Sequence, residues 1–137
     1  MAGEAILIVD DNPTNLKLVR VLLLGEGYDA RTATDAEEAL ELLRSFHPRL
    51  ILMDVQLPGM DGLELTRRLK ANAKTREITV VALTAYAMKG DEQKALDAGC
   101  DGYIAKPIDT RNLPRLVGEY LTRSTAKKRN APDSTTR

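Results

Sequence analysis

The sequence predicts an α/β protein built on a doubly wound, five-stranded parallel sheet with helices on both faces. Two observations predict this fold. Short apolar runs alternate five times with segments of helical spacing, and the runs are continuously apolar, which is typical of strands covered on both faces. The strand order 2-1-3-4-5 is favoured, because it sets the first, third, fourth and fifth strands side by side, where the polar residues that follow them must meet.

The first strand and the first helix have clear boundaries. Ala5–Val9 is the first apolar run, and Asn12 is a suitable N-cap for a helix whose first turn holds Pro13, where a missing N–H costs least. Leucine and valine then repeat at helical spacing until Gly25 and Gly27, which end the helix.

The second strand, Tyr28–Ala33, is less apolar than the first, so we place it near an edge of the sheet. Thr34 and Glu37 have the spacing of a capping box and predict the start of the second helix. An apolar stripe then continues to Leu43, and Pro48 closes the segment.

The remaining strands and helices follow the same alternation. The third and fourth strands are the runs Leu50–Met53 and Val80–Leu83, separated by a loop rich in proline and glycine and by a helix over Leu63–Asn72. A further helix over Lys89–Ala98 ends before a glycine and leads to the fifth strand, Gly102–Ala105.

The last helix should run to about Leu121. Pro114 complicates its start, so we expect either a 3₁₀ turn over Thr110–Leu113 or a helix that begins near the proline. The segment Thr122–Arg137 lacks periodicity and holds five basic residues and one acid, a composition that predicts disorder. We therefore expect one folded domain over residues 1–121 and a basic, disordered tail over residues 122–137.

Composition excludes several classes of protein. The formal net charge is zero and the basic excess lies in the tail, whereas a nucleic-acid binder usually has a basic face on its folded part. No apolar run approaches the roughly 20 residues of a membrane span, and the N-terminus does not have the pattern of a signal peptide. The single cysteine, Cys100, allows no internal disulfide, which fits a reducing compartment. We expect a cytoplasmic protein that binds neither nucleic acid nor membranes.

Polar side chains follow four of the predicted strands. Asp10 and Asp11 come after the first strand, Asp54 after the third, Thr84 after the fourth and Lys106 after the fifth. Ligands of open parallel sheets bind outside the carboxyl ends of the strands, so these side chains should converge. Three carboxylates so close together need a cation to neutralise them, and Asp54 then becomes a candidate phosphoryl acceptor.

The chain resembles the receiver domain of bacterial two-component response regulators, a flavodoxin-like domain, over about residues 4–121. Four segments match, in order and near the family's spacing: Ile-Leu-Ile-Val-Asp-Asp-Asn ending at Asn12, Leu-Met-Asp-Val-Gln-Leu-Pro-Gly-Met-Asp-Gly ending at Gly62, Ala-Leu-Thr-Ala around Thr84, and Gly-Tyr-Ile-Ala-Lys-Pro ending at Pro107. Each segment alone is a weak signal, and the four together are a strong one.

The resemblance implies a site for phosphoryl transfer with Mg²⁺, or Mn²⁺ in its place. Asp54 would accept the phosphoryl group from a phosphohistidine. Asp11 and Asp54 would bind the metal directly, together with the backbone carbonyl of Gln56, while Asp10 would act mainly through water. Mg²⁺ prefers oxygen ligands and keeps several waters, which suits a shallow acidic pocket.

The resemblance also implies which residues respond to phosphorylation. The Thr84 hydroxyl would reach the phosphoryl oxygens, and Lys106 would pair with Asp54 or its phosphate. Inward movement of Thr84 would vacate space beneath Tyr103, the rotating aromatic of the switch, and so change the face formed by the fourth helix, fifth strand and fifth helix. The peptide bond between Lys106 and Pro107 would be cis.

Two further positions should border the path of a water that attacks the acyl phosphate. Gln56 lies two residues after Asp54, and Tyr86 lies two residues after Thr84. A bulky Tyr86 would screen the acyl phosphate and lengthen its life.

Several functions remain open at this point. The leading hypothesis is a stand-alone receiver that is phosphorylated by a histidine kinase or a histidine phosphotransfer protein and then binds an unidentified protein. It would not be an enzyme, apart from slow self-dephosphorylation. A receiver module of a hybrid histidine kinase, or a phosphorelay intermediate, would have the same residues.

Two functions outside phosphorelay signalling compete with this hypothesis. A phosphohydrolase with an aspartyl-phosphate intermediate needs a second acid two residues after its nucleophile, where this chain has Asn12 and Gln56. A scaffold of the same fold that is never phosphorylated would not need the complete acidic set.

Overall fold

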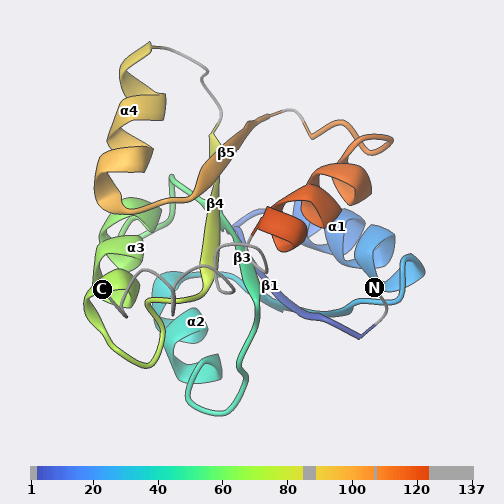
Figure 1. The fold of residues 1–137 in the computed structure, drawn as a ribbon, viewed down its shortest axis with the longest axis horizontal. Coiled ribbons are helices and arrows are strands. Elements are labelled where there is room, and N and C mark those ends of the chain that lie inside the picture. Colours follow the sequence, from blue (N-terminus) through green and yellow to red (C-terminus); the bar gives the residue numbers. More distant parts are fainter. Residues whose placement is uncertain (1–2, 85–88, 107, 124–137) are drawn as a thin grey trace, which may run out of the picture.

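Five parallel strands form one sheet in the predicted order. The strands are β1 (Ala5–Val9), β2 (Asp29–Ala33), β3 (Leu50–Asp54), β4 (Thr79–Thr84) and β5 (Gly102–Ala105). This computed structural model describes residues 3–84, 89–106 and 108–123, and within them the order is β2-β1-β3-β4-β5 (Figure 1). The second strand therefore lies at an edge of the sheet, as its more polar sequence predicts.

Helices cover both faces of the sheet. They are α1 (Pro13–Gly25), α2 (Ala36–Leu42), α3 (Gly62–Ala71), α4 (Lys89–Ala98) and a C-terminal helix over residues 113–123. In Figure 1, α1 and the C-terminal helix lie on one side of the sheet, and α2, α3 and α4 lie on the other. None of the described helices has the length and apolar composition that crossing a membrane requires.

The core consists of two apolar layers, one on each face of the sheet. Alternate side chains of β1 enter opposite layers, because successive strand residues point to opposite faces. Leu7 and Val9 pack toward α2, α3 and α4, whereas Ile6 and Ile8 pack toward α1 and the C-terminal helix. All four side chains are fully buried, which fixes the strand register and therefore the positions of the residues at the strand ends.

The start of α1 confirms the predicted cap. Asn12 Oδ1 accepts the N–H of Thr14 at 2.9 Å and that of Asn15 at 3.1 Å, and Pro13 occupies the first helical position. At the other end, Gly27 has a φ of 91°, in the left-handed region that glycine adopts without strain. This turn leads the chain directly into β2.

The N-cap of α2 is one residue later than predicted. Asp35, not Thr34, is the N-cap, and its Oδ1 accepts the Glu38 N–H at 2.8 Å. The Glu38 carboxylate in turn accepts the N–H of Thr34 at 2.6 Å and its hydroxyl at 2.8 Å. The later start places the buried Ala36 and Ala39 against the sheet. Thr34 and Asp35 are each followed by a glutamate three residues later, so the sequence does not distinguish them as N-caps. The burial of Ala36 and Ala39 favours Asp35.

The C-terminal helix begins at residue 113, so Pro114 falls in its first turn. A turn over residues 110–112 precedes the helix, and the N–H of Leu113 bonds to the Asp109 carbonyl at 2.9 Å. At the second helical position the proline removes no intrahelical hydrogen bond. The helix continues to residue 123, slightly beyond the expected end, and residues 124–137 of the predicted tail lie outside the described residues.

Candidate functional site

The functional side chains predicted from the strand ends lie on neighbouring strands. β1, β3, β4 and β5 are adjacent in the sheet, and Asp54 is paired with Leu83 while Thr84 is paired with Ala105. The ladder extends past the strand ends, because the Lys106 N–H bonds to the Thr84 carbonyl at 2.7 Å. Sheet hydrogen bonding therefore holds the backbone on which the site is built.

Three carboxylates meet at this edge. Asp10, Asp11 and Asp54 each place an oxygen within 4.8 Å of the others. Asp10 and Asp54 are buried, with exposed fractions of 1% and 5%, whereas Asp11 is exposed. The predicted convergence of these residues is thus what the structure shows.

Backbone N–H groups orient the two buried carboxylates. Asp10 Oδ1 accepts the N–H of Asn12 at 2.9 Å, and Asp54 Oδ1 accepts the N–H of Gln56 at 3.0 Å. In both cases the donor lies two residues after the aspartate, as in an Asx turn. Each carboxylate keeps its Oδ2 for another partner.

Lys106 supplies that partner to both carboxylates. Its Nζ lies 3.2 Å from Asp10 Oδ2 and 3.2 Å from Asp54 Oδ2. Among the three acids and this lysine, one positive charge faces three negative charges. A divalent cation would balance the difference, and carboxylate oxygens are the ligands that Mg²⁺ prefers, so the residues present fit a magnesium ion.

The pKa values of the site reflect this imbalance. Burial raises the pKa of Asp54 and the Asp10 charge adds to the rise, although the Gln56 N–H and Lys106 oppose it. Burial alone would lower the pKa of Lys106, but the Asp54 and Asp10 carboxylates raise it. Two carboxylates thus stabilise the charged form of Lys106, whereas the charged form of Asp54 has one lysine beside it and acidic neighbours that also attract that lysine.

The two predicted switch residues are on β4 and β5, with Thr84 at the edge of the sheet where the carboxylates lie and Tyr103 two residues before the end of β5. Thr84 ends β4 and is buried, with an exposed fraction of 8%. Tyr103 is half-buried, and its hydroxyl hydrogen-bonds the Glu92 carboxylate on α4, which raises the Tyr103 pKa. The contact ties the predicted switch aromatic to α4. Glu92 has no signal in the sequence that distinguishes it from any other helical glutamate.

A close approach behind Asp54 was missed by the sequence reasoning. Gly62, the first residue of α3, donates its N–H to the Val55 carbonyl at 2.9 Å. A Cβ at this position would collide with the backbone carbonyl of Asp54 and would lie 3.0 Å from Met53 Cγ. Glycine therefore lets α3 pack against the end of β3, although its place in a glycine-rich loop indicated only a turn.

Other sequence expectations have simple outcomes. Cys100 is buried, its Sγ lies 3.8 Å from the Thr66 hydroxyl, and burial raises the pKa of the thiol, so it behaves as a small core residue. His47 is exposed. Pro107 with its predicted cis bond, and Tyr86, lie outside the described residues.

Fold and site together define a class of protein. A doubly wound domain has an acidic, lysine-containing site at the carboxyl ends of adjacent strands, where domains of this class bind their ligands. The chain belongs to the response regulator receiver domain family, whose family model matches residues 6–118.

Individual relatives agree with this assignment. The polar-differentiation response regulator DivK of Brucella ovis is 45% identical over 118 residues, which are 86% of this chain and 96% of the relative. A putative response regulator from Chloroflexus aurantiacus has a TM-score of 0.83 at 32% identity, over 88% of this chain and 98% of that one.

A third relative was solved with a metal. The receiver domain of a sensor histidine kinase from Pseudomonas aeruginosa has a magnesium ion coordinated in its active site cleft. It has a TM-score of 0.80 at 35% identity, over 88% of this chain and 99% of that one. The relatives thus include both a response regulator and a domain of a kinase.

Proposed function

We propose that this chain is a stand-alone response regulator receiver and that Asp54 is its phosphoacceptor. One observation supports this assignment above the others: Asp54 ends β3, the central strand of the sheet, between the acids that follow β1 and Thr84 at the end of β4. Asp10 shares the burial, the acidic neighbours and the lysine, but it follows β1, on the side of the site away from β4. The DivK relative supports the stand-alone reading, because the match spans 96% of that protein.

The reaction that we propose is transfer of a phosphoryl group from a phosphohistidine. An Asp54 carboxylate oxygen forms a bond to phosphorus, the bond from phosphorus to the histidine nitrogen breaks, and its electron pair stays on the imidazole. Charge develops on the phosphoryl oxygens during transfer, and Lys106, which lies 3.2 Å from Asp54, is placed to neutralise it.

A divalent cation completes the charge balance in this proposal. Asp11 and Asp54 would hold Mg²⁺ directly, the Gln56 carbonyl would be a third ligand, and Asp10 would act mainly through water. The ion would supply positive charge to the phosphoryl oxygens. The residues themselves position the acceptor, because the Gln56 N–H and Lys106 fix the two oxygens of Asp54.

In this proposal, phosphorylation changes the surface formed by α4, β5 and the C-terminal helix, and a partner protein binds there. The Thr84 hydroxyl would bond to the phosphoryl oxygens, and Tyr103 would leave its contact with Glu92 on α4. A groove of about 460 Å³ lies on this side of the molecule, lined in part by Tyr103, Leu116 and Tyr120. A protein partner that binds there would sense the position of Tyr103.

The phosphoryl donor has a second surface available. Leu18, Val21 and Leu24 on α1 are 42%, 58% and 42% exposed, and they are three of the four large apolar side chains exposed among the described residues. α1 begins two residues after Asp11, so a protein docked on this helix would be near the acidic site. We propose that a histidine kinase or histidine phosphotransfer protein docks there.

The phosphohydrolase alternative has no comparable support. Asn12 and Gln56 occupy the positions where such enzymes need a second acid, and both use their groups for local structure. Asn12 caps α1 through its side chain, and the Gln56 N–H orients Asp54. We propose that the protein is a phosphoacceptor and not an enzyme that turns over phosphate esters.

Intact-protein mass spectrometry tests the assignment. After incubation with acetyl phosphate and Mg²⁺, the wild-type chain should gain the mass of one phosphoryl group, and Asp54→Asn should not. Asp29→Asn, which changes an exposed carboxylate on β2, is the matched control and should be modified like the wild type. An adduct of equal yield on Asp54→Asn would contradict the proposed acceptor.

A further inference from the structure

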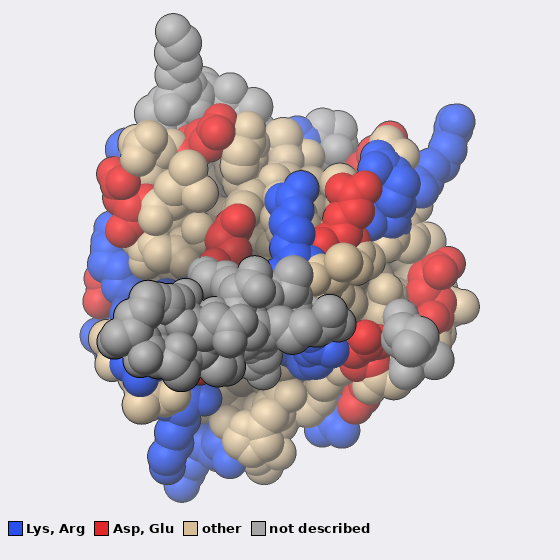
Figure 2. Space-filling view, in the orientation of Figure 1, with Lys and Arg blue, Asp and Glu red and all other residues tan. Residues whose placement is uncertain are grey.

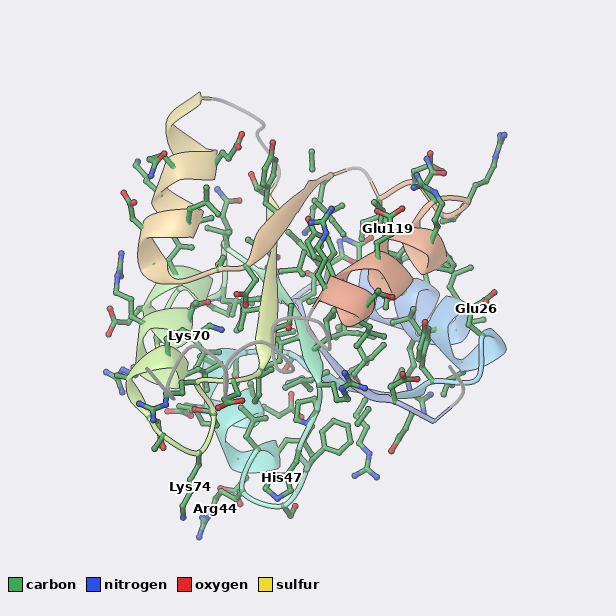
Figure 3. All side chains as sticks on the ribbon, viewed as in Figure 1. Glu26, Arg44, His47, Lys70, Lys74 and Glu119 are labelled. Atoms are coloured by element: carbon green, nitrogen blue, oxygen red, sulfur yellow. The ribbon has the colours of Figure 1, made fainter. Side chains whose placement is uncertain are left out.

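A second hollow lies at the end of the sheet opposite to the carboxylates. It has a volume of about 480 Å³ and lies between the end of α2 and the segment after α3. The residues before β3 and before β4 line it, so it is at the amino ends of these strands. Figure 3 shows Arg44, His47 and Lys74 together at this end of the molecule, below α2. We call it the α2–α3 groove.

The rim of the α2–α3 groove is cationic. Arg44, Arg68 and Lys74 line it together with the His47 imidazole, and none of its lining residues is acidic. Blue Lys and Arg side chains gather along the same lower edge of the surface in Figure 2. Within the described part of the chain, the Lys74 ammonium has no ion-pair partner.

The two arginines have partners that an incoming carboxylate can replace. Arg44 lies 3.4 Å from Glu41, and the two side chains are 77% and 74% exposed. Arg68 lies 3.4 Å from Glu64, and these side chains are 58% and 44% exposed. Exposed pairs of this kind are strongly screened by water and contribute little, so exchanging one carboxylate for another is nearly neutral.

The floor of the α2–α3 groove is apolar. Leu40 and Leu43 of the α2 segment are half-buried, and Leu69 of α3 closes the space between the two helices. An apolar side chain that enters the groove would bury Leu40 and Leu43 further. The groove therefore combines an anchor position with a cationic rim, the arrangement that protein interfaces use.

From these features we infer that the α2–α3 groove binds an acidic segment of a partner protein. A leucine-like side chain would rest on the three leucines, and flanking carboxylates would pair with Arg44, Arg68 and Lys74. An extended acidic chain is favoured over a small phosphate ligand, because the cations are exposed around an open groove. The polar groups beside them are already used: the Thr75 hydroxyl donates to the Leu69 carbonyl at 2.7 Å, and Asn72 Oδ1 accepts the Lys74 N–H at 2.9 Å.

Binding at the α2–α3 groove should not depend on phosphorylation. The groove is at the amino ends of the strands, whereas Asp54, Thr84 and Lys106 are at or beyond the carboxyl ends. A partner held there would remain bound while the opposite end of the domain changes state. The inference goes beyond the proposed phosphoacceptor role and does not rest on it.

Fluorescence anisotropy with a labelled peptide tests this inference on the full chain. The probe has a pair of leucines flanked on both sides by glutamates. It should bind the wild type, and the double charge reversal Arg44→Glu/Lys74→Glu should weaken binding by about tenfold. The double variant Lys17→Glu/Arg111→Glu changes the net charge equally at exposed positions elsewhere, and it should change the affinity less than about twofold.

Two probe variants separate the contributions of the rim and the floor. Replacing the glutamates by glutamine, or the leucines by serine, should each weaken binding, and backbone amide shifts in NMR should change mainly within residues 40–47 and 68–75. Equal losses in the two double variants would overturn the inference. So would binding that ignores the leucines, or inorganic pyrophosphate that displaces the peptide at lower concentration than the unlabelled peptide itself. Affinity that is the same in Asp54→Asn would confirm that the groove acts independently of the phosphoacceptor.

Discussion

Replacing Asp54 by asparagine should stabilise the metal-free protein, because the site is repulsive without a cation. Asp54 Oδ2 lies 3.2 Å from Lys106 Nζ, an attraction of about 5 kcal/mol at an effective dielectric constant of about 20. The nearest oxygens of Asp10 and Asp11 lie within 4.8 Å, so each adds a repulsion of about 3.5 kcal/mol on the same scale.

Two further effects decide the size of the change. Asp11 is exposed, so water screens its repulsion, whereas the burial of Asp54 penalises its charge. The pKa of Asp54 is raised above its unfolded value, so the charged form costs stability above the folded pKa, and that cost disappears as the pH falls through it. The two repulsions, with that of Asp11 reduced by screening, slightly exceed the attraction to Lys106, so at neutral pH we expect Asp54→Asn to raise the free energy of unfolding by about 1 kcal/mol. An asparagine keeps an amide oxygen for the Gln56 N–H.

Magnesium should reverse this order of stability. An ion that binds only the folded state at ten times its Kd adds about 1.4 kcal/mol to the wild type. Asp54→Asn has lost one ligand and one negative charge, so it should gain less. The chain has no tryptophan, so urea unfolding is best followed by far-UV circular dichroism, once in EDTA and once in Mg²⁺.

The matched control is Asp29→Asn, which removes an exposed carboxylate 3.5 Å from Arg31. It should change stability little and should gain from Mg²⁺ as the wild type does. If Asp54→Asn were less stable than the control in EDTA, the carboxylates would not be in net repulsion. If Mg²⁺ stabilised Asp54→Asn and the wild type equally, Asp54 would not be a ligand.

Three further predictions concern individual contacts within the fold. Gly62→Ala should lower the free energy of unfolding by about 2 kcal/mol or more, because the added Cβ would collide with the Asp54 carbonyl. Gly25→Ala on α1, where nothing lies near the added Cβ, should be neutral or stabilising, and urea unfolding would compare the two variants. Lys70→Met should cost about 2 kcal/mol, because Lys70 Nζ bonds to the Ile78 carbonyl at 2.7 Å and to Asp101 at 3.0 Å, whereas the exposed Arg68→Met should cost under about 0.5 kcal/mol. If Lys70→Met and Arg68→Met lowered the free energy of unfolding equally, the Lys70 hydrogen bonds would not have the stabilising role given to them. Glu92→Gln should lower the pKa of Tyr103 toward 10.0, and NMR titration of the tyrosine ring carbons would show the change. A Tyr103 titration curve that is the same in both proteins would mean that Tyr103 does not face α4 in solution.

Local signals predicted the boundaries of several elements well. β1, β5 and α4 have the predicted residues, and the cap and proline at the start of α1 are as expected. These elements depend on residues adjacent in sequence. The start of α2 was wrong by one residue, because two neighbouring N-cap candidates were chemically equivalent and only packing against the sheet distinguished them.

The candidate site was predictable in its members but not in its pairing. The carboxyl ends of parallel strands lie at one edge of the sheet, so the sequence alone predicted that Asp10, Asp11 and Asp54 would meet. The strand ends do not predict that Lys106 Nζ lies equally close to Asp10 and Asp54, because these distances depend on the path of one side chain across β4. The pairing of Lys70 with Asp101 was likewise invisible, since 31 residues separate them.

The repulsion between the acids persists because the sheet leaves them no room to separate. The β1 and β3 side chains that precede them are almost completely buried, and the ladder between these strands continues to Val9 and Met53. A relaxed backbone would relieve the repulsion only by breaking this packing, which is worth far more than the electrostatic gain. The site must therefore be neutralised from outside, and we expect a divalent cation and a phosphoryl group to act in sequence. Thr84 ends the next strand in the sheet, β4, so we expect its hydroxyl to respond to that change of charge and Tyr103, on β5 beyond it, to follow.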